Sequence, residues 1–406
     1  MLIRETRLKR ISRRNGLTFL AIVLAIFIIV IISFSAFFSL GATKSADNYL
    51  ADIGGSNSTL APSSSPAQLS ISNNIVVSHQ PTPKPLHAVY MSSWVAGNKT
   101  AREKLLKRLA GTNINTIVID VKDSSGKIVV KLNAPALAKY DSFDSHVADI
   151  TEFVNELHHQ GYYVIGHISV FEDNYLTRRR PDLAIQRVDN GELWEDDKGM
   201  AWLDVSSQEV WDYAIAVAKE AYVAGFDELN FDYIRFPSDG KISNMHFPYY
   251  DASKKTRVEA LEEFYRYLHN QMRDIGVPTS ADIFGMTTTN TDDLGIGQIL
   301  EKTAPYFDYV CPMIYPSSYP TGFRGFKNPA TVPYKIIKLS LDSAVRRLAA
   351  DNLPITKIRP WLQDFNLGAT YTPSMVRSEI KAVNDSGLDS WMAWDSSNQY
   401  TISAYR

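Results

Sequence analysis

The chain has 406 residues and a formal net charge of −2, and 45% of its residues are hydrophobic. This length and composition suit one large globular domain with accessory segments, because enough apolar side chains are present to bury a sizeable core. The nearly neutral charge argues against nucleic acid as a partner, and the single cysteine, Cys311, excludes a disulfide within the chain.

A basic cluster and a long apolar run open the chain. Lysines and arginines are frequent in residues 1–16, whereas residues 17–40 contain no charged side chain. A helix over 17–40 is long enough to cross a bilayer, and its positive flank should stay in the cytoplasm. We therefore predict a single-pass protein of the cell membrane whose C-terminal domain is extracellular. A cleaved signal peptide is the alternative, and it would give a secreted protein.

Residues 41–85 have the composition of a linker. They are rich in Ser, Asn and Pro and show no sustained apolar period. Such a segment has too few apolar side chains to bury a core. We predict a disordered linker between the membrane helix and the following domain.

Residues 86–406 alternate short apolar runs with amphipathic helical stretches, the pattern of parallel strands joined by helical crossovers. Eight strands are predicted, over residues 88–94, 116–123, 163–171, 228–237, 279–286, 309–316, 357–365 and 390–395. The main helices are predicted over residues 100–110, 149–160, 208–224, 256–275, 334–351 and 373–384. Eight such repeats favour a closed (β/α)8 TIM barrel over an open sheet.

Two predicted strands carry acidic residues near their carboxyl ends. Period-two alternation places Asn230 and Asp232 on one face of a strand, and Ser280 and Asp282 on one face of the next. In a barrel these ends converge on one rim, where barrel enzymes hold their catalytic groups. A glycosidase needs one ionised and one protonated carboxyl group. We assign Asp232 as nucleophile or base and Asp282 as the acid, whereas helix capping is the competing role for other acids at this rim.

Other polar and aromatic side chains near the predicted strand ends are assigned to substrate binding. For His167 a core hydrogen bond to a carboxylate is an equal alternative, and for Lys122 pairing with Asp120 or Asp232 is simpler than Schiff-base chemistry. No metal or other cofactor is predicted, because the histidines do not form a ligand set. The assigned binding residues are Asp120, Lys122, His167, Asn230, Arg235, Tyr315, Gln363 and Trp394.

Several linked motifs resemble a bacterial family of glycoside hydrolase domains that was formerly catalogued only as a domain of unknown function. The motifs cover residues 231–237, 280–285, 312–316 and 360–365, and the resemblance extends over about residues 86–395. It implies a glycosidase-type barrel that acts on a carbohydrate. The strand around Asp232 matches the chitinase-type signature only in part, since Ile234 occupies the position at which that signature has its catalytic Glu.

These observations together predict a glycoside hydrolase that acts on an envelope or extracellular polysaccharide through carboxylates at strand ends. The partners expected are this polysaccharide and, through residues 17–40, the membrane. The alternative from another class is a non-catalytic barrel that binds glycan. A second acid close to an unblocked Asp232 would favour the enzyme, and an Asp232 locked to Arg235 or Lys122 would favour the binder.

Overall fold

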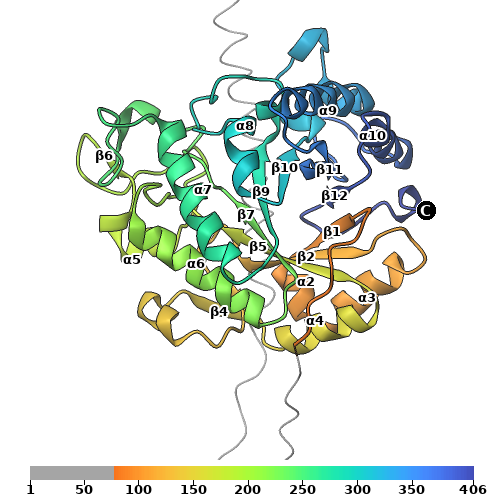
Figure 1. The fold of residues 1–406 in the computed structure, drawn as a ribbon, viewed down its shortest axis with the longest axis horizontal. Coiled ribbons are helices and arrows are strands. Elements are labelled where there is room, and N and C mark those ends of the chain that lie inside the picture. The colour runs from red at the N-terminus through yellow and green to blue at the C-terminus, as the bar shows by residue number, and fades with distance from the viewer. Residues whose placement is uncertain (1–76) are drawn as a thin grey trace, which may run out of the picture. The chain divides into compact units, whose positions relative to one another are not determined.

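The computed structural model describes residues 77–406, in which eight parallel strands close into a barrel (Figure 1). Neighbouring strands follow one another as β1, β2, β5, β7, β9, β10, β11 and β12, and β12 pairs with β1 to close the ring. All eight predicted strands are present, and each ends one to five residues before the expected boundary. Their bounds are β1 (His87–Met91), β2 (Thr116–Lys122), β5 (Tyr163–Ser169), β7 (Glu228–Asp232), β9 (Thr279–Phe284), β10 (Tyr309–Met313), β11 (Trp361–Gln363) and β12 (Trp391–Trp394).

Helices connect these strands, as the sequence predicts, and the (β/α)8 fold is confirmed for residues 77–406. The six predicted helices are α3 (Lys99–Leu109), α4 (Ile150–His159), α6 (Gln208–Val223), α7 (Arg257–Arg273), α9 (Pro333–Ala350) and α10 (Pro373–Asp385). Three shorter helices are α2 (Ser93–Gly97), α5 (Leu176–Arg179) and α8 (Leu300–Thr303). Local sequence sets their ends: α7 starts with a capping box in which Thr256 and Glu259 satisfy each other's backbone N–H groups.

Two additions extend the barrel. Next to β2 lie β3 (Ile128–Val130), which is antiparallel to β2, and β4 (Phe143–Val147), which pairs with β3. In the long loops after β5 and β7, a small antiparallel pair forms from β6 (Gln186–Arg187) and β8 (Met245–His246). Both additions follow strands at their carboxyl ends, so they build up the rim where the catalytic groups are expected.

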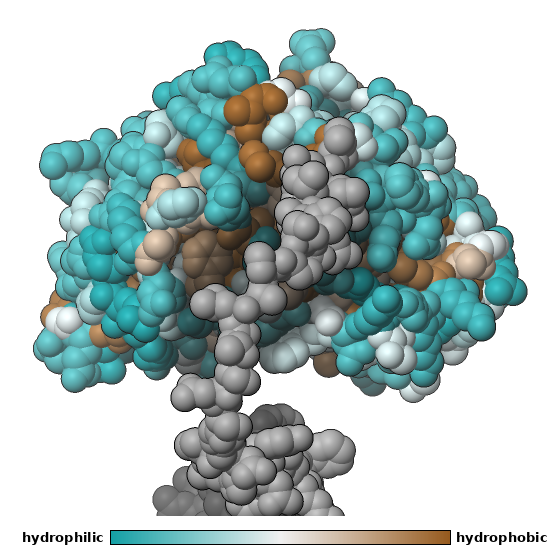
Figure 2. Space-filling view, turned by 90° about the horizontal axis from the view of Figure 1, so that it is seen from below, coloured by the Kyte–Doolittle hydropathy of each residue, from teal (hydrophilic) through white to brown (hydrophobic). Residues whose placement is uncertain are grey.

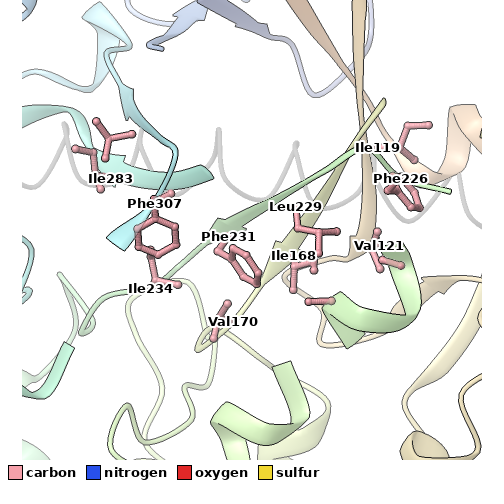
Figure 3. Packing of buried hydrophobic residues seen from close by; sticks show 14 of the residues in the cluster. Ile119, Val121, Ile168, Val170, Phe226, Leu229, Phe231, Ile234, Ile283 and Phe307 are labelled. Atoms are coloured by element: carbon pink, nitrogen blue, oxygen red, sulfur yellow. The ribbon is translucent and has the colours of Figure 1, made fainter. Parts of the chain in front are cut away.

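The main hydrophobic core lies between the strands and the surrounding helices. Outward-facing side chains of neighbouring strands, such as Ile119, Ile168, Phe231 and Ile283, belong to one buried cluster (Figure 3). The barrel interior holds a second, smaller cluster that includes Trp361. The alternation of side chains along each strand therefore separates an apolar outer layer from an interior that can carry polar groups.

A chain of polar groups crosses the barrel interior near the amino ends of the strands. Arg359 donates to both carboxylate oxygens of Glu228, at 2.8 and 3.2 Å, and both side chains are fully buried. The hydroxyl groups of Ser280 and Tyr163 also donate to Glu228, at 2.7 and 3.3 Å. These contacts tie four parts of the barrel together beneath the rim.

The described chain begins against the amino ends of the strands. The Gln80 amide donates to the Asp227 carboxylate at 2.6 Å, and the hydroxyls of Thr82 and Tyr163 lie 3.0 Å apart. Residues 77–85, assigned above to the linker, thus contact the barrel. The predicted membrane helix at 17–40 lies outside the described residues. Within residues 77–406 no helix is both long and apolar enough to span a membrane.

The surface of the described domain is mainly hydrophilic on the face that Figure 2 shows, with hydrophobic residues in small separate areas. Large hydrophobic side chains that are exposed are few among residues 77–406. The most exposed of them is Trp94, at 70%.

Candidate active site

A pocket of about 250 Å³ opens where the strands of the barrel end. Its wall comes from β1, β2, β5, β7, β9, β10 and β12 and from the turns that follow them, so it lies at the carboxyl rim, where the sequence predicts the site. The lining residues are Tyr90, Asp120, Asp123, Ser124, His167, Asp232, Tyr233, Asp282, Met313, Tyr315 and Trp394.

His167 connects two of the carboxylates in this pocket. Its Nδ1 lies 3.0 Å from Asp120 Oδ1, and its Nε2 lies 3.3 Å from Asp232 Oδ2. Burial alone would lower the pKa of His167, but the hydrogen bonds and charges of Asp120 and Asp232 raise it well above its usual value. His167 is therefore an imidazolium that donates to both carboxylates, and Tyr90 Oη supplies Asp120 with a further donor at 2.6 Å.

Asp282 is more buried than Asp120 and Asp232, with 2% of its surface exposed. Its Oδ1 accepts hydrogen bonds from Asn230 Nδ2 and Trp361 Nε1, both at 2.8 Å. Burial raises the pKa of Asp282 to about 8, and the neighbouring charge of Asp232 acts in the same direction. At neutral pH Asp282 consequently keeps its proton.

Asp232 accepts two hydrogen bonds that suit a charged carboxylate. Oδ2 faces His167, and Oδ1 accepts from the Tyr233 amide at 2.6 Å. The backbone of Tyr233 has φ 53°, in the left-handed region that bulky residues rarely adopt. Such backbone strain clusters at functional sites.

The same three side chains could in principle ligate a cation. One donor atom each of His167, Asp232 and Asp282 lies within 4.8 Å of the others. A metal-bound imidazole must offer a free lone pair, however, and both nitrogens of His167 face carboxylates that raise its pKa. The donor set therefore fits a proton-sharing network better than a metal site.

Aromatic rings form one wall of the pocket. Trp394 stacks on Tyr90 with ring centres 4.0 Å apart, and Trp361 meets Trp394 edge-on at 5.5 Å. Tyr315 completes the lining and packs its ring against Phe365 at 5.6 Å. Flat apolar surfaces beside carboxylates suit sugar rings, which present both C–H faces and hydroxyl groups.

A further carboxyl group with a raised pKa lies just after β5. Glu172 is 7% exposed, and a backbone bridge joins it to Trp202, whose ring meets Tyr233 edge-on at 5.9 Å. Burial raises the pKa of Glu172 to about 8; the charge of Arg235 opposes this shift, and that of Asp232 adds to it. The position of Glu172 just after a strand predicts that it lies at the rim. Its burial could not be predicted in this way, because it depends on the segment around Trp202, which is distant in sequence.

Not every residue assigned from the sequence lies in the pocket. Asp120, His167, Tyr315 and Trp394 line it with Asp232 and Asp282, and Asn230 contacts Asp282. Arg235 instead lies 4.8 Å above the Trp202 ring.

Lys122 and Gln363 have structural partners in place of the predicted substrate contacts. Lys122 Nζ bonds to Asp173 at 2.9 Å and to the Ser169 carbonyl at 2.8 Å. The β2–β5 register shifts between Asp120 and Lys122, and this irregularity turns Lys122 away from the face that Asp120 occupies. Gln363 Oε1 accepts from the Ser317 amide at 3.1 Å and so holds the loop after β10.

Five residues of the pocket are absent from the sites assigned from the sequence: Tyr90, Asp123, Ser124, Tyr233 and Met313. Tyr90 was detectable, because alternation from Ala88 places it on the inner face of β1. Ser124 lies in a turn and Met313 at the end of an apolar run, and neither position carried a signal of function.

The described domain matches a known family over nearly its whole length. The model of the family described as "Putative glycosyl hydrolase domain" matches residues 88–400. The chain belongs to this family. The predicted resemblance is thereby confirmed, and with it the prediction of a glycoside hydrolase at the level of the family. No curated protein matches the chain.

Solved structures of glycoside hydrolases share this family's barrel. The glycoside hydrolase domain of PgaB (BpsB) from Bordetella bronchiseptica has 11% identity and a TM-score of 0.57, covering 77% of this chain and 95% of that one. Alpha-L-fucosidase isoenzyme 2 from Paenibacillus thiaminolyticus has 14% identity and a TM-score of 0.50, covering 79% and 49%. At such identities the likeness shows the fold alone.

A shorter relative is more similar in sequence. A hypothetical protein from Ruminiclostridium thermocellum ATCC 27405 is 32% identical, covering 48% of this chain and 96% of that one, with a TM-score of 0.43.

Proposed function

We propose that this protein hydrolyses glycosidic bonds of an envelope or extracellular polysaccharide in the pocket at the barrel rim. One observation carries the proposal: two carboxyl groups of adjacent strands meet there with different hydrogen-bond partners. Asp232 accepts hydrogen bonds from an imidazolium and an amide, whereas Asp282 keeps a proton because of its burial. Glycoside hydrolysis needs one carboxylate that attacks and one carboxylic acid that donates a proton.

The spacing of the pair supports a retaining mechanism. Oxygen atoms of Asp232 and Asp282 approach within 4.8 Å. Retaining glycosidases hold their carboxyl groups about 5 Å apart, and inverting ones about 6.5–9.5 Å to admit a water. In this proposal Asp232 attacks the anomeric carbon, and Asp282 protonates the departing glycosidic oxygen. The Asp282 carboxylate then takes a proton from the water that releases the sugar from Asp232.

The contacts of Asp232 favour catalysis over simple binding. Among residues 77–406 its side chain forms an ion pair with neither Arg235 nor Lys122, and Lys122 is taken up by Asp173. A second acid stands beside Asp232. A non-catalytic glycan-binding barrel remains the outcome if no polysaccharide is cleaved.

The place of action is part of the same proposal. The basic flank and the apolar segment at 17–40 support a membrane-tethered enzyme with its barrel outside the cell. Cleavage after the apolar segment would give a secreted form instead. Both forms would encounter extracellular polysaccharide. Its sugar rings and glycosidic bonds match the aromatic and acidic side chains of the pocket.

The test is hydrolysis by the full chain, solubilised in a neutral detergent and supplied with a panel of bacterial envelope polysaccharides. The wild type should release reducing ends from at least one polysaccharide, and Asp232→Asn should lower the turnover about a hundredfold or more, because it removes the attacking charge without changing size. Asp351→Asn, an exposed acid outside the pocket, is the matched control.

Thermal unfolding of each variant separates catalysis from folding. Near-normal hydrolysis by a folded Asp232→Asn variant would refute the role of Asp232. Proton NMR of the first product should show the anomeric configuration of the substrate, and an inverted product would refute the retaining mechanism.

A further inference from the structure

Trp94 is the most exposed large hydrophobic side chain of residues 77–406. It is 70% exposed and lies on α2, directly after β1, whereas Ser93 and Ala96 of the same turn are buried. Burying a tryptophan contributes strongly to stability, so a tryptophan left in solvent calls for a reason. Asn98 and Lys99, which directly follow α2, are exposed, and so is Asp144, whose carboxylate lies 3.7 Å from His146 Nε2.

The exposed indole is held in one orientation. The His146 ring stacks on it with ring centres 3.8 Å apart and planes 29° apart. His146 is held in turn by Ser93, whose Oγ lies 3.0 Å from its Nδ1. The backbone also fits closely, because a Cβ on Gly97 would lie 2.2 Å from the His146 carbonyl oxygen. One indole face is therefore covered and fixed, and the other is open to solvent.

This ring stands on the same side of the barrel as the pocket. α2 follows the carboxyl end of β1, whose Tyr90 lines the pocket (Figure 1). Asn398 fixes the segment between them, since it accepts from the Ser92 amide at 3.1 Å and donates to the Tyr90 carbonyl at 3.1 Å. Four residues span at most about 14 Å, so Trp94 and Tyr90 are within reach of one extended chain molecule.

We propose that Trp94, backed by His146, is a separate binding site for a sugar ring of a polysaccharide whose other units enter the pocket. The proposal rests on the proposed function for the class of ligand. A fixed aromatic face binds the C–H face of a sugar at little entropic cost, because the ring is already ordered. A membrane or a protein partner would need a contiguous apolar patch, and the exposed neighbours of Trp94 are polar.

The site gives the enzyme a preference for long substrates. A short oligosaccharide that fills only the pocket gains nothing from Trp94, whereas a polymer gains a second contact. The contact lies away from the reacting bond, so it should act on binding and leave the chemical step unchanged.

Affinity electrophoresis measures this binding without requiring hydrolysis. The full chain with Asp232→Asn is run in native detergent gels that contain glycol chitin, carboxymethyl cellulose or soluble galactomannan. At least one polymer should retard it, and adding Trp94→Ala should weaken that retardation roughly tenfold, or about 1.4 kcal/mol. Trp94→Phe should keep most of the retardation, because it keeps a flat ring.

The matched control is Val223→Ala, which shortens another exposed apolar side chain, at the end of α6 and away from the rim. It should migrate as the parent does. The proposal is overturned if none of the three polymers retards the parent chain, or if Trp94→Ala is retarded as strongly as the parent. Retardation that depends on Trp94 without hydrolysis by the wild type would refute the proposed function and leave this site standing.

Discussion

Asp282 keeps its proton because its surroundings disfavour a second negative charge beside Asp232. Its two donors, Asn230 and Trp361, are neutral, and the side chain is almost completely buried. His167 compensates Asp120 and Asp232 and lies 3.9 Å from Asp282. One cation thus faces three acids, and a proton on Asp282 lowers the number of negative charges around it from three to two.

The pH dependence of hydrolysis follows from this proton. Asp282 is protonated below a pKa of about 8, so kcat/KM should fall as the pH rises above about 8. With a polysaccharide, whose leaving group needs a proton, Asp282→Asn should lose most of its kcat/KM, whereas an aryl glycoside with a good leaving group needs no proton and should still be cleaved. If the variant keeps its kcat/KM and its alkaline fall with the polysaccharide, the acid is another group, and Glu172 is the first to test.

The protonation of Asp282 can also be measured through the stability of the protein, independently of activity. The folded pKa of Asp282 lies above the ordinary value of 3.8, so between about pH 4 and pH 8 the folded state binds more protons than the unfolded state. The contribution of Asp282 to the free energy of unfolding therefore falls as the pH rises through this window. Urea unfolding at several pH values should show a flatter profile for Asp282→Asn.

At the scale of elements, the Arg359–Glu228 pair joins parts of the barrel that are far apart in sequence. Glu228 lies at the start of β7, Arg359 lies just before β11, and Ser280 of β9 and Tyr163 of β5 add hydrogen bonds. The pair lies below the pocket, so it sets the spacing of the strands that carry Asp232 and Asp282.

Removing one partner of this buried pair should be costly. Arg359→Met leaves the Glu228 charge uncompensated, and we expect a loss of about 3–5 kcal/mol in the free energy of unfolding. The double variant Arg359→Met, Glu228→Gln should regain much of this loss, because no unpaired charge remains. Urea unfolding of the single and double variants measures the coupling, and purely additive effects would contradict it.

Local patterns predict the strands and helices here, and long-range contacts decide the rest. The apolar runs of β2, β5 and β9 and the capping residues before α7 act within a few positions, so their elements could be predicted. Alternation also brought Asn230, Asp232 and Asp282 to one site. The register shift after Asp120 moved Lys122 elsewhere, and no local pattern signals such a shift. Partners such as Arg359 for Glu228 are separated by 131 positions, beyond the reach of any periodicity.

At the scale of the whole molecule, the proposed topology can be tested in intact cells. If residues 17–40 remain as an anchor with residues 1–16 inside, an external protease should remove the barrel and leave a small membrane-bound fragment. Immunoblotting with tags at both termini follows the two parts. Full protection of the C-terminal tag in intact cells, with cleavage after lysis, would contradict export, and a barrel found only in the medium would support the secreted form.

The contacts of residues 77–85 have a practical consequence for handling this enzyme. Gln80 and Thr82 fasten the incoming chain to the amino ends of β7 and β5, and the pocket opens at the other ends of the same strands. A bead, sensor chip or scaffold coupled within residues 77–85 would therefore hold the barrel at the end opposite the pocket. Immobilised in this way, the enzyme should have its pocket facing the dissolved polymer. Random coupling through surface lysines would instead leave the pocket of some molecules facing the support.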